Sequence, residues 1–194
     1  YIFSTSTGSL LYTLDNPNPY DTSANDYFAR SVGISDSYAI VGAYQEDDSG
    51  GTSSGKAYIF DNSTGSLLHT LNNPNAYGTP TYDVFGSYVA ISDSYTIVGV
   101  ELEDSPGSSN SGKAYIFDNS TGSLLHTLDD PNPYGNAMDD RFGRSVGISD
   151  SYAIVGAYKE DAAGAGDSGK VYIFSTSTGS LLYTLDNPNA YDTA

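Results

Sequence analysis

The sequence has 194 residues, of which 24 are Asp or Glu and 7 are Lys or Arg, so its formal net charge is −17. A chain this acidic repels phosphate backbones and anionic lipid headgroups, so neither nucleic acid nor a membrane surface is an expected partner. The chain has no cysteine, which excludes disulfides and thiolate chemistry. No apolar run approaches the roughly 20 residues that cross a bilayer, so membrane insertion is not expected either.

The first predicted element is a β-hairpin. Residues 1–3 and 10–14 are short apolar runs, and the Ser/Thr-rich segment between them contains a glycine. Such runs around a glycine-containing turn are typical of paired strands. The Asn- and Pro-rich residues 15–19 end the hairpin, because Pro cannot donate to a sheet ladder and Asn favours turns.

The next segment contains a complete set of four predicted strands. They are expected at residues 31–35, 38–42, 57–60 and 67–71. A tight Asp36-Ser37 turn joins the first two, and a loop rich in Gly, Ser and Asp precedes the third. No segment has apolar residues at the i, i+3, i+4, i+7 spacing of a helix, so we expect almost no helix.

The same pattern recurs every 57 residues. Phe28 returns as Phe85 and Phe142, and the run Tyr-Ile-Phe begins at residues 1, 58, 115 and 172. A fixed period of this size indicates a repeat architecture, in which the repeat is the folding unit. Four short antiparallel strands per period are the composition of a β-propeller blade.

We therefore predict an all-β, propeller-like array of four-stranded antiparallel blades, with three and a half blades in the chain. The expected parts are a half-blade hairpin with its connection (1–29), blade 1 (30–86), blade 2 (87–143) and blade 3 with a trailing loop (144–194). Residues 172–194 match 1–23 at all but two positions, which indicates a second period of 171 residues. Both ends fall inside a repeat, so we expect a longer array.

Two motifs in each period resemble a known family. Phe-Gly stands at 85–86 and 142–143 and is relaxed to Phe-Ala at 28–29, while Val-Gly-Ala stands at 41–43 and 155–157. With an Asp before the first motif and Ser-Gly-Lys before Tyr-Ile-Phe, the pattern resembles the FG-GAP repeat of integrin alpha chains and bacterial surface proteins. The second motif departs from the family, because Tyr replaces its Pro and residues 98–101 read Val-Gly-Val-Glu. The resemblance implies a propeller at the cell surface or outside the cell, and it implies no particular function.

The resemblance also implies calcium. Members of the family often hold Ca²⁺ in an Asp-x-Asp-x-Asp-Gly loop, a pattern that this sequence lacks. The corresponding loops carry adjacent acids, which are Glu46, Asp47, Asp48, Glu103, Asp104, Glu160 and Asp161. Ca²⁺ takes about six to eight oxygen ligands, so these acids are candidate ligands, with help from Asp26, Asp83 or Asp140. The alternative is that they are solvated loop acids.

Two Asn-x-Ser/Thr sequons are candidate glycosylation sites. Asn62 and Asn119 fall in predicted hairpin turns, where we expect exposed side chains. Such sequons also arise by chance in turns rich in Ser and Thr.

Catalysis is not expected. His69 and His126 occupy the same repeat position, which is Tyr12 and Tyr183 in the other copies. A position that accepts either residue is better explained as a structural strand position than as a general base. No serine lies in a nucleophile elbow. The same acids recur in each blade, whereas glycoside hydrolysis needs one asymmetric pair of carboxylates.

Two functions remain as hypotheses. The first is a non-enzymatic extracellular structural or adhesive protein, whose partners are copies of itself or adjoining repeats. The unpaired edge of a half-blade invites such pairing, and head-to-tail contacts that do not close produce filaments. The alternative is a closed propeller that binds a sugar or protein ligand through loops ordered by Ca²⁺. A binding site predicts one blade that breaks the pattern, as blade 2 does at residues 100–103.

Overall fold

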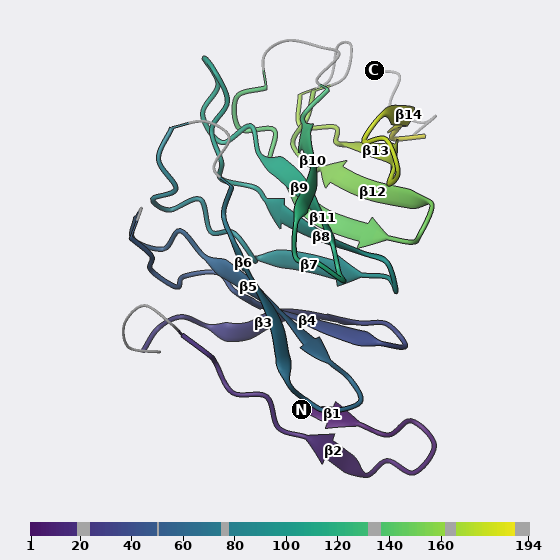
Figure 1. The fold of residues 1–194 in the computed structure, drawn as a ribbon. Coiled ribbons are helices and arrows are strands. Elements are labelled where there is room, and N and C mark those ends of the chain that lie inside the picture. Colours follow the sequence, from purple (N-terminus) through teal and green to yellow (C-terminus); the bar gives the residue numbers. More distant parts are fainter. Residues whose placement is uncertain (19–23, 50, 75–77, 132–136, 162–165, 189–194) are drawn as a thin grey trace.

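The protein is all-β over the residues that the computed structural model describes, which are 1–18, 24–49, 51–74, 78–131, 137–161 and 166–188. Within them, one two-stranded sheet is followed by three four-stranded antiparallel sheets, which confirms the predicted architecture of three and a half blades. The chain runs from the β1–β2 hairpin at one end of the array to β14 at the other, so the two ends lie far apart (Figure 1). The end of the predicted trailing loop, residues 189–194, lies outside the described residues.

The strands repeat with similar lengths and in the same order. The half-blade consists of β1 (Ile2–Phe3) and β2 (Leu10–Tyr12). Blade 1 consists of β3 (Phe28–Ile34), β4 (Tyr38–Ala43), β5 (Lys56–Asp61) and β6 (Leu67–Asn72). Blade 2 consists of β7 (Tyr88–Ile91), β8 (Tyr95–Val100), β9 (Lys113–Asp118) and β10 (Leu124–Asp129). Blade 3 consists of β11 (Phe142–Ile148), β12 (Tyr152–Ala157), β13 (Lys170–Ser175) and β14 (Leu181–Asp186).

Two strands begin two residues earlier than the expected blade limits. β3 starts at Phe28, which pairs with Ala43, and β11 starts at Phe142, which pairs with Ala157. In both strands the register then shifts before regular pairing resumes. Because of this shift, the aromatic residue does not fit the simple alternation of side chains by which a strand is recognised in a sequence. Phe28 and Phe142 therefore belong to the blades that they open.

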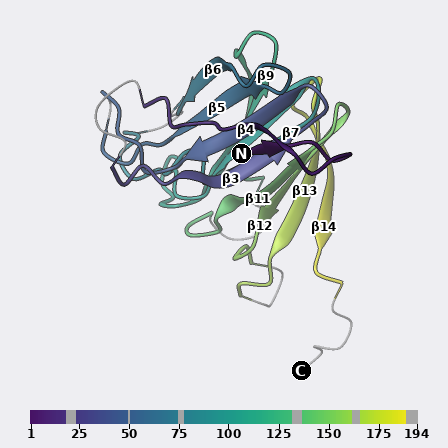
Figure 2. The same ribbon diagram turned by 90° about the horizontal axis from the view of Figure 1, so that it is seen from below.

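The hydrophobic cores lie between successive blades. One core joins Ile40, Ile59 and Leu71 of blade 1 to the opposing face of blade 2, which includes Val89 and Ile91. The next core joins blade 2 to blade 3 in the same way. Because the middle strands of blade 2, β8 and β9, are covered on both faces, their residues are apolar on both sides. The sheets fan out around the first strands, where β3 contacts β7 and β7 contacts β11 (Figure 2).

The glycines of the two motifs lie where the backbones of adjacent blades touch. A Cβ added at Gly99 would lie 2.0 Å from the carbonyl oxygen of Gly143, and one at Gly42 would lie 1.9 Å from that of Gly86. In blades 2 and 3 the phenylalanine of the first motif is fully buried beside them. The Phe85 ring meets Phe117 edge to face, with centroids 6.1 Å apart. Aromatic pairs with this geometry stabilise a fold by more than the burial of their surface area alone.

Backbone hydrogen bonds also join the blades at the ends of the strands. The loop before β5 runs beside the segment that opens blade 2, where the Tyr82 amide donates to Thr52 O (3.0 Å) and the Phe85 amide to Ser54 O (3.0 Å). The next junction repeats the pattern. At the opposite end, the Ser37 amide donates to the carboxylate of Asp93 in the next blade (3.3 Å). The blades are therefore fixed to each other along the whole sheet.

Gly99→Ala should destabilise the protein strongly. The added methyl group meets a backbone oxygen, which moves only if the two blades separate, so we expect a loss of about 2 to 3 kcal/mol in unfolding free energy. Gly166→Ala is the control, because a Cβ there meets nothing closer than 3.7 Å. Urea unfolding followed by tyrosine fluorescence measures both. Equal midpoints for the two variants would contradict the close contact.

Candidate functional site

The acidic loops place their glutamates in the interior. Glu46, Glu103 and Glu160 follow the second strand of each blade, and all three are fully buried. Each carboxylate accepts a hydrogen bond from the tyrosine twelve residues later on the third strand. Tyr58 donates to Glu46 at 2.6 Å, Tyr115 donates to Glu103 at 2.6 Å, and Tyr172 donates to Glu160. The prediction that these glutamates are solvated is wrong, because the loop turns back over the sheet and aims them at its core.

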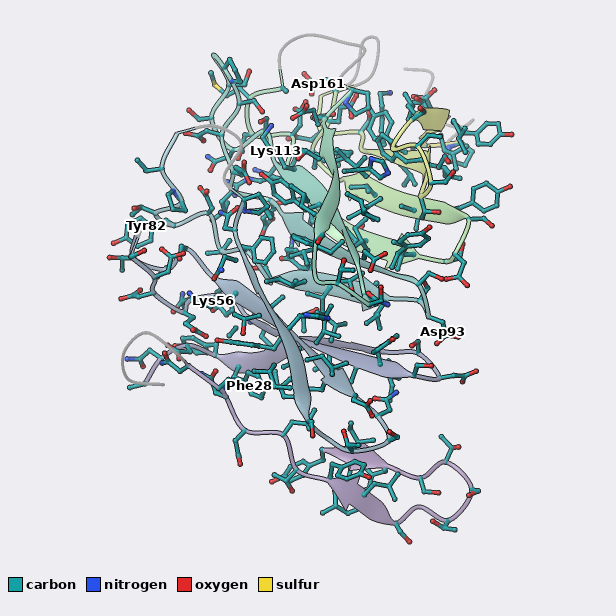
Figure 3. All side chains as sticks on the ribbon, in the orientation of Figure 1. Phe28, Lys56, Tyr82, Asp93, Lys113 and Asp161 are labelled. Atoms are coloured by element: carbon teal, nitrogen blue, oxygen red, sulfur yellow. The ribbon has the colours of Figure 1, made fainter. Side chains whose placement is uncertain are left out.

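A buried lysine accompanies each glutamate–tyrosine pair. Lys56 and Tyr58 are two residues apart on β5, so both side chains lie on the same face. The Lys56 ammonium lies 3.8 Å from the Glu46 carboxylate and donates to Asp47 O at 3.2 Å. Lys113 and Lys170 pair with Asp129 and Asp186 at the ends of the fourth strands. Lys56, Lys113 and Asp161 lie away from Asp93, which marks the opposite end of the sheets (Figure 3).

The aspartates beside the glutamates bind the backbone of their own loop. Asp47 accepts from the Ser53 amide (2.7 Å), and Asp104 accepts from the Asn110 amide (2.8 Å). Asp161 accepts from the Asp167 amide at 2.9 Å. The three donor residues all have positive φ values near 50°, a backbone conformation that costs energy for a side-chain-bearing residue. The carboxylates stabilise this strained turn. In the loop of blade 1, Asp48 also accepts a hydrogen bond from the Gly51 amide at 3.0 Å.

A second buried carboxylate lies near each glutamate. Asp26, Asp83 and Asp140 precede the first strand, and each is at least 94% buried. Asn16 and Asn18 donate to Asp26, and Asn73 donates to Asp83 at 3.0 Å. Burial, followed by the charge of Glu103, raises the pKa of Asp83 to about 7.

The third blade has two acids with raised pKa values. Burial raises the pKa of Asp140 to about 6 and that of Glu160 to about 7. Burial and Glu160 also raise the pKa of the Tyr172 hydroxyl far above its usual value, so it stays protonated and donates. These are the shifts expected of carboxyl groups held in a protein interior.

The predicted metal ligands therefore divide into two groups. The glutamates face the core, whereas the aspartates face the loop backbone. Among the described residues no three acidic or histidine side chains are arranged to hold a metal ion. Ca²⁺ binding at Glu46, Asp47, Asp48, Glu103, Asp104, Glu160 and Asp161 stays a prediction. No helix in the described part of the chain is long and apolar enough to cross a membrane.

The two sequon asparagines are not exposed as expected. Asn119 is 1% exposed, and its amide nitrogen donates to Ser92 O at 2.8 Å while its amide oxygen accepts from Thr96. Asn62 is half-buried and donates to Ser35 O at 2.9 Å. Both cap the turn between the first two strands of their own blade. In the folded blade, the nitrogen that would carry a glycan is already engaged.

The histidines occupy structural positions. The His69 and His126 rings lie over Gly122 and Gly179, in the hairpin turns of the following blades. Tyr12 lies over Gly65 in the same way. A flat ring over a glycine suits either His or Tyr, which explains their exchange in the sequence.

Comparison with known proteins identifies the repeat. The family model described as FG-GAP repeat matches residues 18–60, 76–117 and 133–174. The chain belongs to the FG-GAP repeat family. Among solved structures, it is similar to BamB from Moraxella catarrhalis, with a TM-score of 0.45 and 17% sequence identity. That similarity covers 82% of this chain and 38% of the length of the BamB chain. No curated protein matches the sequence.

Sequence reasoning missed that the glutamate, the lysine and the tyrosine at these repeat positions are buried in each blade. A signal was available, because the spacing from Glu46 to Lys56 and Tyr58 recurs without change in the other two blades. A loop that is exposed to solvent tolerates insertions more readily than a loop that is anchored at both ends. The constant spacing, combined with a lysine two residues before a tyrosine on a strand, indicates an anchored loop.

Tyr58→Phe should destabilise blade 1 by about 1 to 3 kcal/mol. The substitution keeps the ring and removes the hydroxyl that donates to the buried Glu46 carboxylate. Tyr183→Phe is the control, since that side chain is exposed. Denaturant unfolding of both variants checks the prediction, and equal stability of the two proteins would contradict it.

Stability should fall as the pH rises from about 4 to about 7. A carboxyl group whose folded-state pKa exceeds its ordinary value contributes stability below that ordinary value and loses it as the pH passes the folded-state pKa. Asp83 has this shift, from 3.8 to about 7. Thermal unfolding in EDTA across this range measures the fall, and Asp83→Asn should reduce it. An unchanged pH profile in Asp83→Asn would show that Asp83 does not carry the effect.

Proposed function

We propose that this protein is a non-enzymatic, extracellular structural protein whose copies join end to end. The observation that carries the proposal is that two successive junctions between blades have the same composition, so a blade fits any neighbouring copy of the repeat. The FG-GAP family supports a repeat protein of the propeller type. An adhesive and filament-forming role is the further step that the repeated junctions support.

Blade 3 carries the same surface that blades 1 and 2 pack against the next blade. Ile40 and Ile97 are fully buried at the two internal junctions, whereas their counterpart Ile154 is 44% exposed. Leu71 and Leu128 are buried as well, whereas their counterpart Leu185 is 47% exposed. These side chains share their end of the array with the exposed rings of Tyr152 and Tyr183.

The first blade presents the complementary surface. Val89 and Ile91 of β7 are buried under blade 1, whereas Val32 and Ile34 at the same positions of β3 are each 62% exposed. Blades 1 and 3 therefore carry the two halves of the interface that joins successive blades. A surface of this kind fits a head-to-tail contact, which extends into a filament when the rotation between copies does not close a ring.

The absence of catalysis is part of the same proposal. The acids that recur in each blade have structural hydrogen-bond partners, and the same set is built into three consecutive blades. Repeated exposed leucine pairs at the start of the fourth strands suit contact with other surfaces. These pairs are Leu10 and Leu11, Leu67 and Leu68, Leu124 and Leu125, and Leu181 and Leu182.

The alternative proposal is a closed propeller that binds a sugar or protein through Ca²⁺-ordered loops. Its best support in the sequence is the irregular segment of blade 2, and Glu101 of that segment has internal partners. Glu101 lies 3.3 Å from the Arg144 guanidinium and accepts a hydrogen bond from Tyr88 at 3.0 Å. The irregularity therefore serves the junction with blade 3, which favours the structural proposal.

The intact protein should form elongated particles that lengthen with concentration. Negative-stain imaging, with sedimentation velocity over a wide concentration range, measures this in Ca²⁺ and in EDTA. We expect the same particles in both buffers, because the junctions between blades are apolar. Isolated discs that fall apart in EDTA would support the alternative, and a monomer at all concentrations would contradict the structural proposal.

A further inference from the structure

We propose that copies of this protein also stack along the direction of their strands, with the acidic turns of one copy on a cationic surface of the next. The acidic turns join the first two strands of each blade and carry Asp36, Asp93 and Asp150. The cationic surface, called the cation cluster below, consists of Arg30, Arg141, Arg144 and Lys159. The inference rests on the proposed function and deepens it, because it names a second contact between copies and the residues that form it.

The exposed cations of the chain share one end of the sheets. The sequence contains seven Lys and Arg residues, and three of them, Lys56, Lys113 and Lys170, are buried. The other four are those of the cation cluster. They lie at or next to the place where the first strand of a blade begins and its second strand ends. These two strands are paired antiparallel, so the start of one lies beside the end of the other.

Glu101 lies among these cations, at the internal junction between blades 2 and 3. The Arg144 guanidinium of blade 3 lies 3.3 Å from its carboxylate. Burial raises the pKa of Glu101, and the charges of Arg141, Arg30 and Lys159 act against this rise, so these three cations lie near the same carboxylate. The cation cluster is therefore one surface, to which blades 1 and 3 both contribute.

The cation cluster has an excess of positive charge. Glu101 pairs with Arg144, while Asp139 pairs with Arg141 at 2.5 Å and with Lys159 at 2.6 Å. Among the described residues of this surface, two carboxylates thus face four cations. On a chain whose formal net charge is −17, this excess attracts the carboxylates of a partner to one place.

Tyrosine rings hold the arginines of the cluster in position. The Arg144 guanidinium lies 4.8 Å from the centroid of the Tyr88 ring and 5.8 Å from that of Tyr158, and the Arg30 guanidinium lies 5.2 Å from that of Tyr44. A guanidinium is attracted to an aromatic face and keeps its planar donors free for a carboxylate. Because Tyr and Arg are enriched among the residues that dominate protein–protein binding, this surface fits a protein partner with exposed acids.

The opposite end of the same strands carries the complementary charge. Asp36, Asp93 and Asp150 are exposed, one in each blade. Their turns project on the same side of the array (Figure 1), and Asp93 marks this end in Figure 3, away from Lys56 and Lys113. None of the seven Lys and Arg residues lies in the described turns at this end. A second copy of the chain is therefore a partner with exposed acids.

The acidic turns and the cation cluster have the same spacing. Both belong to the first two strands of the blades, and the first strands β3, β7 and β11 lie side by side. A copy that is translated along its strands brings one acidic turn to each blade of the next copy. This match in spacing favours a second copy over an acidic polysaccharide. A translation does not close, so the contact extends into a stack.

Stacking should weaken when salt is added. Raising the salt concentration from about 10 mM to about 1 M shortens the Debye length from about 30 Å to about 3 Å. The stacked species should then disappear from sedimentation velocity profiles, while particles joined through the apolar junctions remain. Screening of the overall net charge would increase association instead. Wild-type particles that do not become smaller as salt is added would overturn stacking and leave the proposed function intact.

The contact itself is tested by charge reversal with Arg30→Glu and Asp36→Arg. Both side chains are exposed, so each variant should fold, as circular dichroism will show. Each variant alone should lose stacking, because like charges meet, two acids in the first and two cations in the second. A 1:1 mixture should recover stacking, since alternating copies pair opposite charges at each contact. Folded variants whose mixture stays unstacked would overturn the pairing of turn and cluster.

The variants also separate a specific contact from overall repulsion. Asp36→Arg replaces a negative charge by a positive one, so the net charge of −17 becomes −15. If overall repulsion controlled association, this variant would associate more strongly than the wild type. Asp167→Asn is the matched control, because it removes a negative charge from the loop before β13, and Asn tolerates the positive φ of 50° at that position. It should stack like the wild type.

Different results overturn different statements. Stacking by Asp36→Arg alone to the wild-type extent would overturn the contact. A wild type that does not stack but binds polygalacturonate, with binding lost in Arg30→Glu, would also overturn it and show that the cation cluster binds an acidic polysaccharide. A wild type that stays monomeric at all protein and salt concentrations would overturn the proposed function itself.

Discussion

The hydrogen bond between a buried glutamate and the tyrosine twelve residues later anchors the long loop inside each blade. A buried carboxylate is costly unless it is hydrogen-bonded, so the loop between the two residues has a defined length and path. That path brings residues 52–54 beside the segment that opens blade 2, where backbone hydrogen bonds form. The loop anchored inside one blade therefore positions the glycine and phenylalanine motif of the next blade. The internal anchor and the contact between blades are parts of one arrangement.

This arrangement changes how the acidic residues are interpreted. An excess of carboxylates suggests a surface that binds cations, yet several of the acids are interior groups with raised pKa values and tyrosine or asparagine donors. Glu101, which interrupts the repeat pattern, has an arginine and a tyrosine of the neighbouring sheets as partners. The hydrogen bonds and ion pairs of these acids stabilise the array. What remains for interaction is the exposed surface of the array.

The near identity of the blades makes their junctions alike. The two cores between successive blades contain the same kinds of side chain at the same repeat positions. The two faces that meet at one junction are therefore complementary to the faces that meet at the next junction.

The sequence by itself determined the repeat period, the all-β class, the four strands of each blade and the structural role of His69 and His126. These depend on local alternation, turn residues and comparison between copies, all of which are visible in the chain. The direction of each side chain in a loop was decided only by the tertiary structure. Glu46 and Asp47 are neighbours with similar chemistry, but one meets Tyr58 in the core and the other meets the backbone of its own loop. Asn119 lies in a turn that looks exposed, and it is buried because the preceding turn of the same sheet, 27 residues earlier, folds onto it. Contacts between residues that are distant in the chain set these directions, and no local pattern records them.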